Sequence, residues 1–296
     1  MIASDEKRSA VLSIGRIYCD LIFTGLDEMP VLGRELFAGN LEIAAGGGAF
    51  ISAAHVGQVG RRVALVSRLG TDTLSLGIGE QIRDSGIDMR FIEHAVDAGP
   101  QITVAAVVGK ERAFLTRRAG PAQPSTLAAA LEWPQAQHLH IAEYATLYEM
   151  PDLVLRAKAI GLTVSLDPSW DASLIYDPEL LGACRGVDIF FPNLEEAEAI
   201  TGSADPESAI KLLARTFPIV ALKGGDRGAW VASGDVLIHL PAKGVPVVDT
   251  TGAGDAFNAG FLDCWLDEGA MPSCLLAGIE AGSLAVQTAG GAPLRP

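Results

Sequence analysis

The sequence contains little cysteine and no arrangement of cysteine or histidine that is typical of a metal site. Its four cysteines, Cys19, Cys184, Cys264 and Cys274, lie in apolar stretches and include no C-x-x-C pair. The five histidines show no metal-ligand spacing. We therefore expect buried free thiols, which are typical of a reducing cytoplasm, rather than a disulfide framework or a zinc site.

Positive charge is also scarce, because 22 basic residues stand against 36 acidic ones and the net charge is −14. A chain this acidic is a poor general binder of nucleic acid or of anionic membranes. It has no run of about 18 apolar residues that would predict a membrane span. Residues Met1–Arg8 are polar and charged, so no signal peptide is predicted. A phosphate-bearing ligand would need local binding devices, such as a helix N-terminus, a metal or a few placed cations.

What the sequence does have is a regular alternation of apolar strand-like and helix-like segments. Hydrophobic residues make up 49% of the chain. Strands are predicted at 10–14, 62–67, 102–108, 138–141, 163–166, 188–191 and 219–223, and helices at 49–59, 76–85, 150–160, 194–200, 206–215, 255–266 and 274–287. This alternation predicts an α/β fold whose mostly parallel sheet is covered on both faces. Hairpin signals within the first ~120 residues predict a small β appendage.

The stretch with the clearest chemistry is VVDTTGAGDAFNAGFL, residues 247–262. Gly252, Ala253 and Gly254 have minimal side chains, so a ligand can approach their N–H groups at the start of the predicted helix. Such a helix N-terminus favours an anion, including a transferring phosphoryl group. Asp255 lies at the mouth of this anion hole, where a carboxylate could accept a proton from an attacking hydroxyl. Alternatively, Asp255 is only a helix N-cap and the glycines only form a turn.

The segment DTTGAGDAFNAGF resembles the C-terminal signature of the ribokinase-like (PfkB) carbohydrate kinases. Weaker similarities in family order extend the resemblance over almost the whole chain. They comprise Gly15, Asp20, Gly46-Gly47, Gly60, Gly70, Asp72, Gly86-Ile87-Asp88, Asp167-Pro168, Asn193-Leu194-Glu195-Glu196, Lys223-Gly224-Gly225 and Gly228.

The resemblance implies a three-layer, Rossmann-like α/β fold. It implies one ribokinase-like domain over residues 1–296, with a β lid contributed by segments within roughly 15–45 and 88–118. The implied activity is transfer of the γ-phosphoryl group of ATP to a hydroxyl of a sugar, sugar acid or nucleoside. It implies Mg²⁺ and a monovalent cation, K⁺, as cofactors, and family members often form homodimers through the lid.

The resemblance also implies roles for individual residues. Asp255 would be the base, and Gly252, Ala253 and Gly254 the anion hole. The substrate would contact Asp20, Gly46, Gly47, Ser52 and Glu143. The nucleotide would contact Lys223, Gly225, Gly228 and Thr250. Mg²⁺ would be organised, largely through water, by Asn193 and Glu196, and the monovalent cation would lie near Asp249.

Several of these residues also have ordinary structural interpretations. Asp20 could be a turn residue, and Glu196 could be a partner of a helix dipole. Arg112 could reach a phosphate from the lid, although a solvated hairpin tip is the favoured interpretation. The loop near Ala289–Gly291 is a candidate for the adenine pocket.

One departure from the family pattern concerns the substrate. The family's glycine pair is followed by an asparagine that binds sugar hydroxyls, and here that place is Ile51, with Ser52 as the neighbouring polar candidate. Loss of a polar group changes discrimination among polyols, so we expect an acceptor outside the commonest hexoses and ribose.

Two other functional classes stay open at this level. A non-catalytic sugar- or nucleoside-binding homologue is compatible with Ile51, but it would have no need of a base at an anion hole. A dinucleotide-dependent oxidoreductase is suggested by Gly46–Gly48, but the full G-x-G-x-x-G spacing is absent. A Walker-type NTPase is disfavoured, because no G-x-x-x-x-G-K-[ST] motif occurs.

Overall fold

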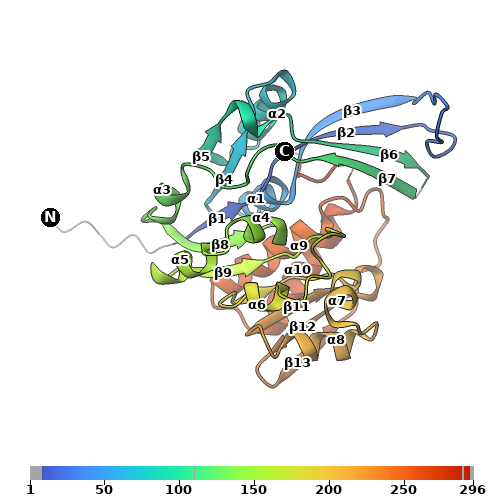
Figure 1. The fold of residues 1–296 in the computed structure, drawn as a ribbon. Helices are drawn as coiled ribbons and strands as arrows, with labels where there is room; N and C mark the ends of the chain where they lie inside the picture. The colour runs from blue at the N-terminus through green and yellow to red at the C-terminus, as the bar shows by residue number, and fades with distance from the viewer. Residues whose placement is uncertain (1–8, 110, 289, 294–296) are drawn as a thin grey trace.

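The computed structural model describes residues 9–109, 111–288 and 290–293 and contains two β-sheets (Figure 1). The main sheet has nine strands in the order β13-β12-β11-β10-β9-β8-β1-β4-β5. Neighbouring strands from β11 to β5 are parallel, and β12 and β13 add an antiparallel edge. The strands are β1 Ala10–Ile14, β4 Val63–Leu69, β5 Asp88–His94, β8 Ala136–Ile141, β9 Thr163–Leu166, β10 Ile189–Phe190, β11 Ile219–Lys223, β12 Ala229–Ser233 and β13 Val236–Leu240.

Helices cover both faces of the main sheet and complete a three-layer α/β architecture. One face packs against α3 Leu127–Leu131, α4 Tyr144–Glu149, α5 Leu153–Ala159, α6 Leu180–Ala183, α7 Leu194–Thr201 and α8 Pro206–Leu213. The other packs against α1 Gly48–Gln58, α2 Thr73–Asp84, α9 Ala253–Leu266 and α10 Met271–Ala285. Strand β1 shows why both faces are apolar, since Leu12 and Ile14 enter one core cluster and Val11 the other. The predicted fold class is confirmed.

The second sheet is small and projects from the main body in Figure 1. Its order is β3-β2-β6-β7, with β2 Tyr18–Thr24, β3 Asn40–Gly46, β6 Ile102–Val108 and β7 Glu111–Arg117. Residues 88–94 belong instead to the main sheet, where β5 runs parallel to β4. The organisation of residues 1–296 as one domain with this sheet as a lid stays a prediction.

Two local differences from the sequence-based expectations have simple causes. The helix predicted at 150–160 is the shorter helix α5, and the separate helix α4 before it was not predicted; Pro151 lies between the two and cannot continue a hydrogen-bonded helix. Helix α9 begins at Ala253, two residues before Asp255. It lies very close to α10, since a side chain at Gly260 would overlap the carbonyl of Ala277. Within the described ranges, no helix combines the length and hydrophobicity needed to span a bilayer.

Candidate active site

The turn before α9 is held in one conformation by contact with a neighbouring loop. Gly252 is the N-cap of α9 and has a φ of 74°, in the left-handed region that favours glycine. A side chain there would overlap the carbonyl oxygen of Gly291, and this oxygen lies 3.0 Å from His55 Nε2. The Ala253 N–H already bonds to the Thr250 carbonyl within the turn. These contacts therefore fix the first turn of α9, a helix N-terminus whose remaining N–H groups favour an anion.

Asp255 lies in the first turn of α9 and faces the start of α1. Ser52 Oγ donates a 2.6 Å hydrogen bond to Asp255 Oδ1. Burial, together with the negative charge of Asp167, raises the pKa of Asp255 to about 7, although the Ser52 hydrogen bond and Lys223 oppose this shift. A carboxylate that titrates near neutral pH is suited to accept a proton from a hydroxyl.

Asp167 is the centre of a buried charge network beside Asp255. It follows β9, and its Oδ2 accepts hydrogen bonds from Lys223 Nζ (2.5 Å) and Asn258 Nδ2 (2.6 Å). Lys223, at the end of β11, also approaches the anion hole, because a Cβ built on Gly254 would lie 3.4 Å from its Nζ. The sequence marks Asp167 as part of an Asp-Pro pair but predicts no role for it. The available signal was a polar residue at the carboxyl end of a parallel strand, where ligands bind in such sheets.

Asn193 and Glu196 form a reciprocal capping box at the start of α7. Asn193 Oδ1 accepts from the Glu196 N–H and Glu196 Oε2 accepts from the Asn193 N–H, each at 2.8 Å. Burial and the charge of Asp167 raise the pKa of Glu196 to about 7, against the opposing charge of Lys223.

These carboxylates suit Mg²⁺ by their chemistry but form no preassembled ligand cluster. In the part of the chain that the structure describes, no group of three or more histidine, cysteine, aspartate or glutamate side chains is poised to hold a metal. Glu196 nevertheless lies near enough to Asp167 for the negative charge of Asp167 to raise its pKa. Such oxygen donors fit Mg²⁺, which keeps several of its waters and binds through few carboxylates.

On the substrate side, Asp20 and the glycine pair come together through β2 and β3. Asp20 pairs with Ala44, and a side chain at Gly46 would overlap the Asp20 carboxylate. Gly47 has a φ of 92°, and a side chain there would overlap the carbonyl of Arg16. Burial raises the pKa of Asp20 to about 6. The glycines thus let the β3–α1 connection pass against β2, next to a partly buried carboxyl group.

Glu143 is the N-cap residue of α4 and is held from two directions. Its Oε1 accepts from Thr146 Oγ1 at 2.7 Å and from the Arg16 N–H at 3.3 Å. Burial raises its pKa, while Thr146 and the nearby Arg118 and Arg16 oppose the shift.

Three further residues near Glu143 were not predicted from the sequence. Arg118 donates to Tyr18 Oη at 3.3 Å and to Asp171 Oδ2 at 2.6 Å. Burial and the charge of Glu143 raise the pKa of Tyr18 to about 12. Tyr18 lies two residues before Asp20, so the period of a strand could have placed both on one face. Arg118 and Asp171 lie in irregular segments, where no sequence pattern relates them.

Arg112 makes a contact that the sequence did not suggest. The favoured expectation was a solvated hairpin tip, and Arg112 is exposed there but is not free of contacts. Arg112 donates to Asp249 Oδ1 at 2.6 Å and to Thr251 Oγ1 at 2.8 Å, so the small sheet reaches the turn before α9. Burial alone would raise the pKa of Asp249, but N–H donors from Thr251 and Gly290, the Thr251 hydroxyl and Arg112 lower it to about 2.

A cavity of about 480 Å³ adjoins the anion hole. It is lined by all four predicted nucleotide contacts, Lys223, Gly225, Gly228 and Thr250, together with Gly254. Its apolar side comes from Val245, Val247, Phe257, Ile279 and Val286, which sequence reasoning missed. The candidate adenine loop instead places Gly290 and Gly291 in the lining of another cavity, and Ala289 lies outside the described residues.

The position that departs from the family pattern has a packing role. Ile51 is 6% exposed, and its Cδ1 would lie 2.8 Å from a Cβ built on Gly291. Ser52, one residue later on α1, instead contacts Asp255. Ser52 therefore supports the candidate base, and its hydroxyl is already hydrogen-bonded there.

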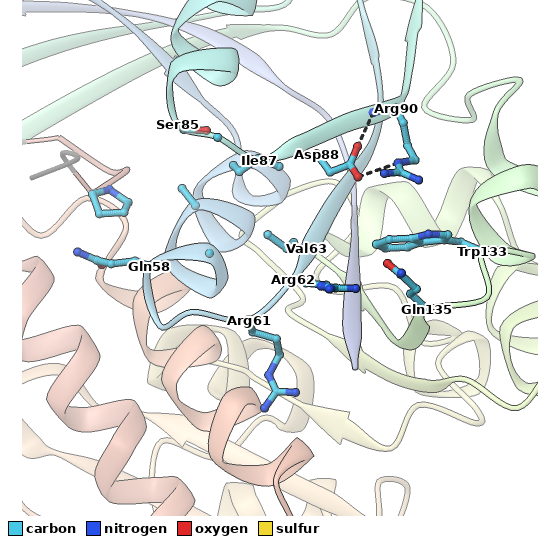
Figure 2. A pocket seen from close by; sticks show the side chains of 14 residues that line it. Gln58, Arg61, Arg62, Val63, Ser85, Ile87, Asp88, Arg90, Trp133 and Gln135 are labelled. Atoms are coloured by element: carbon cyan, nitrogen blue, oxygen red, sulfur yellow. Dashed lines mark hydrogen bonds and ion pairs between the residues drawn. The ribbon is translucent and has the colours of Figure 1, made fainter. Parts of the chain in front are cut away.

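The larger cavity of about 740 Å³ lies at the opposite ends of the strands (Figure 2). Val63 and Asp88, at the starts of β4 and β5, and Trp133 line it, as do several arginines. It includes none of the predicted site residues. Size alone is thus a poor guide to the chemistry, since the smaller cavity adjoins Gly254 and Lys223.

The arrangement of the candidate base, the N-terminus of α9 and the adjoining cavity agrees with the family comparison. The family model described as pfkB family carbohydrate kinase matches residues 9–296. The chain belongs to this family, which confirms the resemblance and the predicted enzyme class, a phosphotransferase with an alcohol group as acceptor.

Individual relatives differ in their acceptors. The chain is 28% identical over 287 residues to a 2-dehydro-3-deoxygluconokinase of Bacillus subtilis, covering 90% of this chain and 86% of that protein. Among solved structures, Arabidopsis thaliana ribokinase complexed with ribose and ATP superposes with a TM-score of 0.83 at 22% identity, over 97% and 95% of the two chains. An Escherichia coli protein assigned as a ribokinase II, in complex with ATP and Mg²⁺, superposes with a TM-score of 0.80 at 22% identity. The match covers 96% of this chain and 94% of that chain.

Proposed function

We propose that this protein is an ATP-dependent kinase that transfers the γ-phosphoryl group to a hydroxyl of a sugar, sugar acid or nucleoside. The observation that carries the proposal is the position of Asp255. This carboxyl group, with a pKa of about 7, lies in the first turn of α9, beside Lys223 and next to the 480 Å³ cavity. A pure binding protein has no need of a base at that place.

In this proposal Asp255 accepts the proton of the attacking hydroxyl, and Ser52 holds the carboxylate in position. The N–H groups of Gly252–Gly254 and the ammonium group of Lys223 stabilise charge on the transferring phosphoryl group. The residues that line the cavity hold ATP, with Thr250, Gly225 and Gly228 on its phosphate side.

Mg²⁺ would be held through water by Asn193 and Glu196, with Asp167 nearby, and would neutralise phosphate charge. A monovalent cation, K⁺, would lie near Asp249. The Asp249 carboxylate supplies oxygen ligands of the kind that K⁺ requires.

The acceptor would bind between the small sheet, acting as a lid, and the main sheet. Asp20, Gly46, Gly47 and Glu143 would surround it, and Ser52 would approach it from beside the base. Because Ile51 packs on Gly291 and offers no polar group, we expect the acceptor preference to differ from that of kinases with asparagine there.

We also propose that the protein forms a homodimer through the small sheet. Leu41, Ile43 and Leu115 lie on the sheet face opposite Asp20 and are 47%, 46% and 73% exposed. A second copy would cover this apolar face. Light scattering of the wild type and of Leu115→Glu would test the dimer, since the variant should be monomeric.

The four free cysteines among the described residues support a reducing, cytoplasmic location.

The kinase proposal is tested by ADP release with Mg²⁺-ATP across a panel of sugars, sugar acids and nucleosides. Turnover with one acceptor that Asp255→Asn abolishes would support it. ATP binding without turnover on any acceptor, combined with tight binding of a sugar or nucleoside, would favour the non-catalytic alternative.

A further inference from the structure

The contact between Arg112 and Asp249 joins the small sheet to the turn before α9. Arg112 lies on β7, opposite Val107 of β6, in the lid hairpin. Asp249 lies 137 residues away, three residues before the α9 N-cap. The two hydrogen bonds from Arg112, to Asp249 and Thr251, therefore tie the lid to the turn that forms the anion hole.

The Asp249 carboxylate is ionised and already rich in donors. Oδ1 accepts from the Thr251 N–H at 2.9 Å, from the Thr251 hydroxyl at 2.8 Å and from Arg112 at 2.6 Å. Oδ2 accepts from the Gly290 N–H at 3.1 Å. The guanidinium thus supplies a full positive charge at the place where the proposed function puts a monovalent cation.

One carboxylate carries a single negative charge, whereas guanidinium and K⁺ each carry a positive one. If both stayed on Asp249, two like charges would lie within a few ångströms of each other on a partly buried group, which is electrostatically unfavourable. The guanidinium side chain is 29% exposed and belongs to a hairpin, so it is the partner that can leave. Oxygen atoms vacated in this way would be open to the cation.

We propose that Arg112 and a monovalent cation compete for the Asp249 carboxylate, so that binding of the cation releases the lid hairpin from the anion-hole turn. Arg112 is then a positioning residue whose contact reports whether the cation is bound. The released guanidinium would be free to approach phosphate in the closed complex. The competition rests on the cation site of the proposed function, but it does not require turnover.

The first test measures K⁺ binding by isothermal titration calorimetry without nucleotide, in tetramethylammonium chloride at constant ionic strength. Because coupling between two sites is reciprocal, Arg112→Gln should bind K⁺ at least about fivefold more tightly than the wild type. Arg117→Gln is the matched control, since Arg117 lies on the same strand but donates to the carbonyl of Pro100. Its K⁺ affinity should equal that of the wild type.

The second test follows amide hydrogen exchange of residues 102–117 with and without K⁺. We expect K⁺ to speed exchange in the wild type, and Arg112→Gln to exchange fast in both conditions. Equal K⁺ affinity in wild type and Arg112→Gln, or no K⁺ binding to either protein, would overturn the competition. Neither readout requires turnover. A silent kinase assay with an intact K⁺ effect would therefore refute the proposed function alone.

Discussion

Asp249 and Asp255 are six residues apart in one motif, yet their surroundings shift their pKa values in opposite directions. Burial and the charge of Asp167 raise the pKa of Asp255 to about 7. Asp249 is also penalised by burial, but N–H donors, a hydroxyl and Arg112 lower its pKa to about 2. One carboxyl group is thus able to exchange a proton near neutral pH, and the other stays charged. The same residue type serves two purposes because the donors around it differ.

The strongest test of this comparison removes the proton acceptor. We expect Asp255→Asn to lower kcat by about 10²–10⁴-fold, which is the typical contribution of general acid–base catalysis. Asparagine keeps the volume and can still accept the Ser52 hydrogen bond, so nucleotide affinity should be nearly unchanged. ADP-release kinetics together with ATP titration would measure both. A variant with kcat within threefold of the wild type would remove Asp255 from the role of base.

The next test changes the turn between the two carboxylates. Gly252→Ala should destabilise the protein by about 1–3 kcal/mol, because alanine is strained at a φ of 74° and would overlap the Gly291 carbonyl. Gly254→Ala is the matched control, since that position is helical and its new methyl group would make only a tolerable contact with Lys223. Urea unfolding of both variants would show the difference. Equal stabilities would mean that the turn is not fixed by Gly291.

A finer test moves the pKa of Asp255 in either direction. Lys223 lowers that pKa and Asp167 raises it. In Lys223→Met the acid limb of the kcat/KM profile should therefore move upward from about pH 7, and in Asp167→Asn it should move downward. Profiles between pH 5 and 9 would measure the limb independently of the overall loss of rate. Shifts of the same sign in both variants would contradict the electrostatic account.

The smallest expected effect is on stability, and its sign differs between the two carboxylates. The folded-state pKa of Asp255 is raised from 3.8 to about 7, so its contribution to stability is present below about pH 4 and is lost as pH rises through 7. Asp255→Asn should therefore gain in Tm relative to the wild type as pH increases from 4 to 8.

Asp249 should behave in the reverse way, because its pKa is lowered to about 2. Its stabilising contribution is present above the ordinary pKa of 3.8 and is lost only as pH falls through about 2. Asp249→Asn should then have a lower Tm than the wild type at pH 7. Scanning calorimetry at several pH values would measure both variants, and a Tm gain in Asp249→Asn at pH 7 would contradict this assignment.

Much of the fold was predictable because it depends on local patterns. Apolar runs such as Ala10–Ile14 and Ile219–Lys223 become buried strands wherever they pair, and Gly252 marks the start of α9 by its own conformational freedom. Strand β3 and the placement of residues 88–94 were missed. Leu41 and Ile43 of β3 are apolar but exposed on the small sheet. A prediction that assigns apolar residues to a buried core therefore does not find this strand.

The sequence by itself determined the family, the fold class and the segment that carries Asp255, the proposed base, because a glycine-rich turn before a helix needs those residue types next to one another. Only the tertiary structure decided which partners surround each carboxylate. Ser52 contacts Asp255, which is 203 residues away in the sequence. Lys223 contacts Asp167 across 56 residues, and Arg112 contacts Asp249 across 137 residues. Such contacts follow from the order of strands in the two sheets. No local pattern encodes them, because hydrogen bonds and charges act across space and not along the chain.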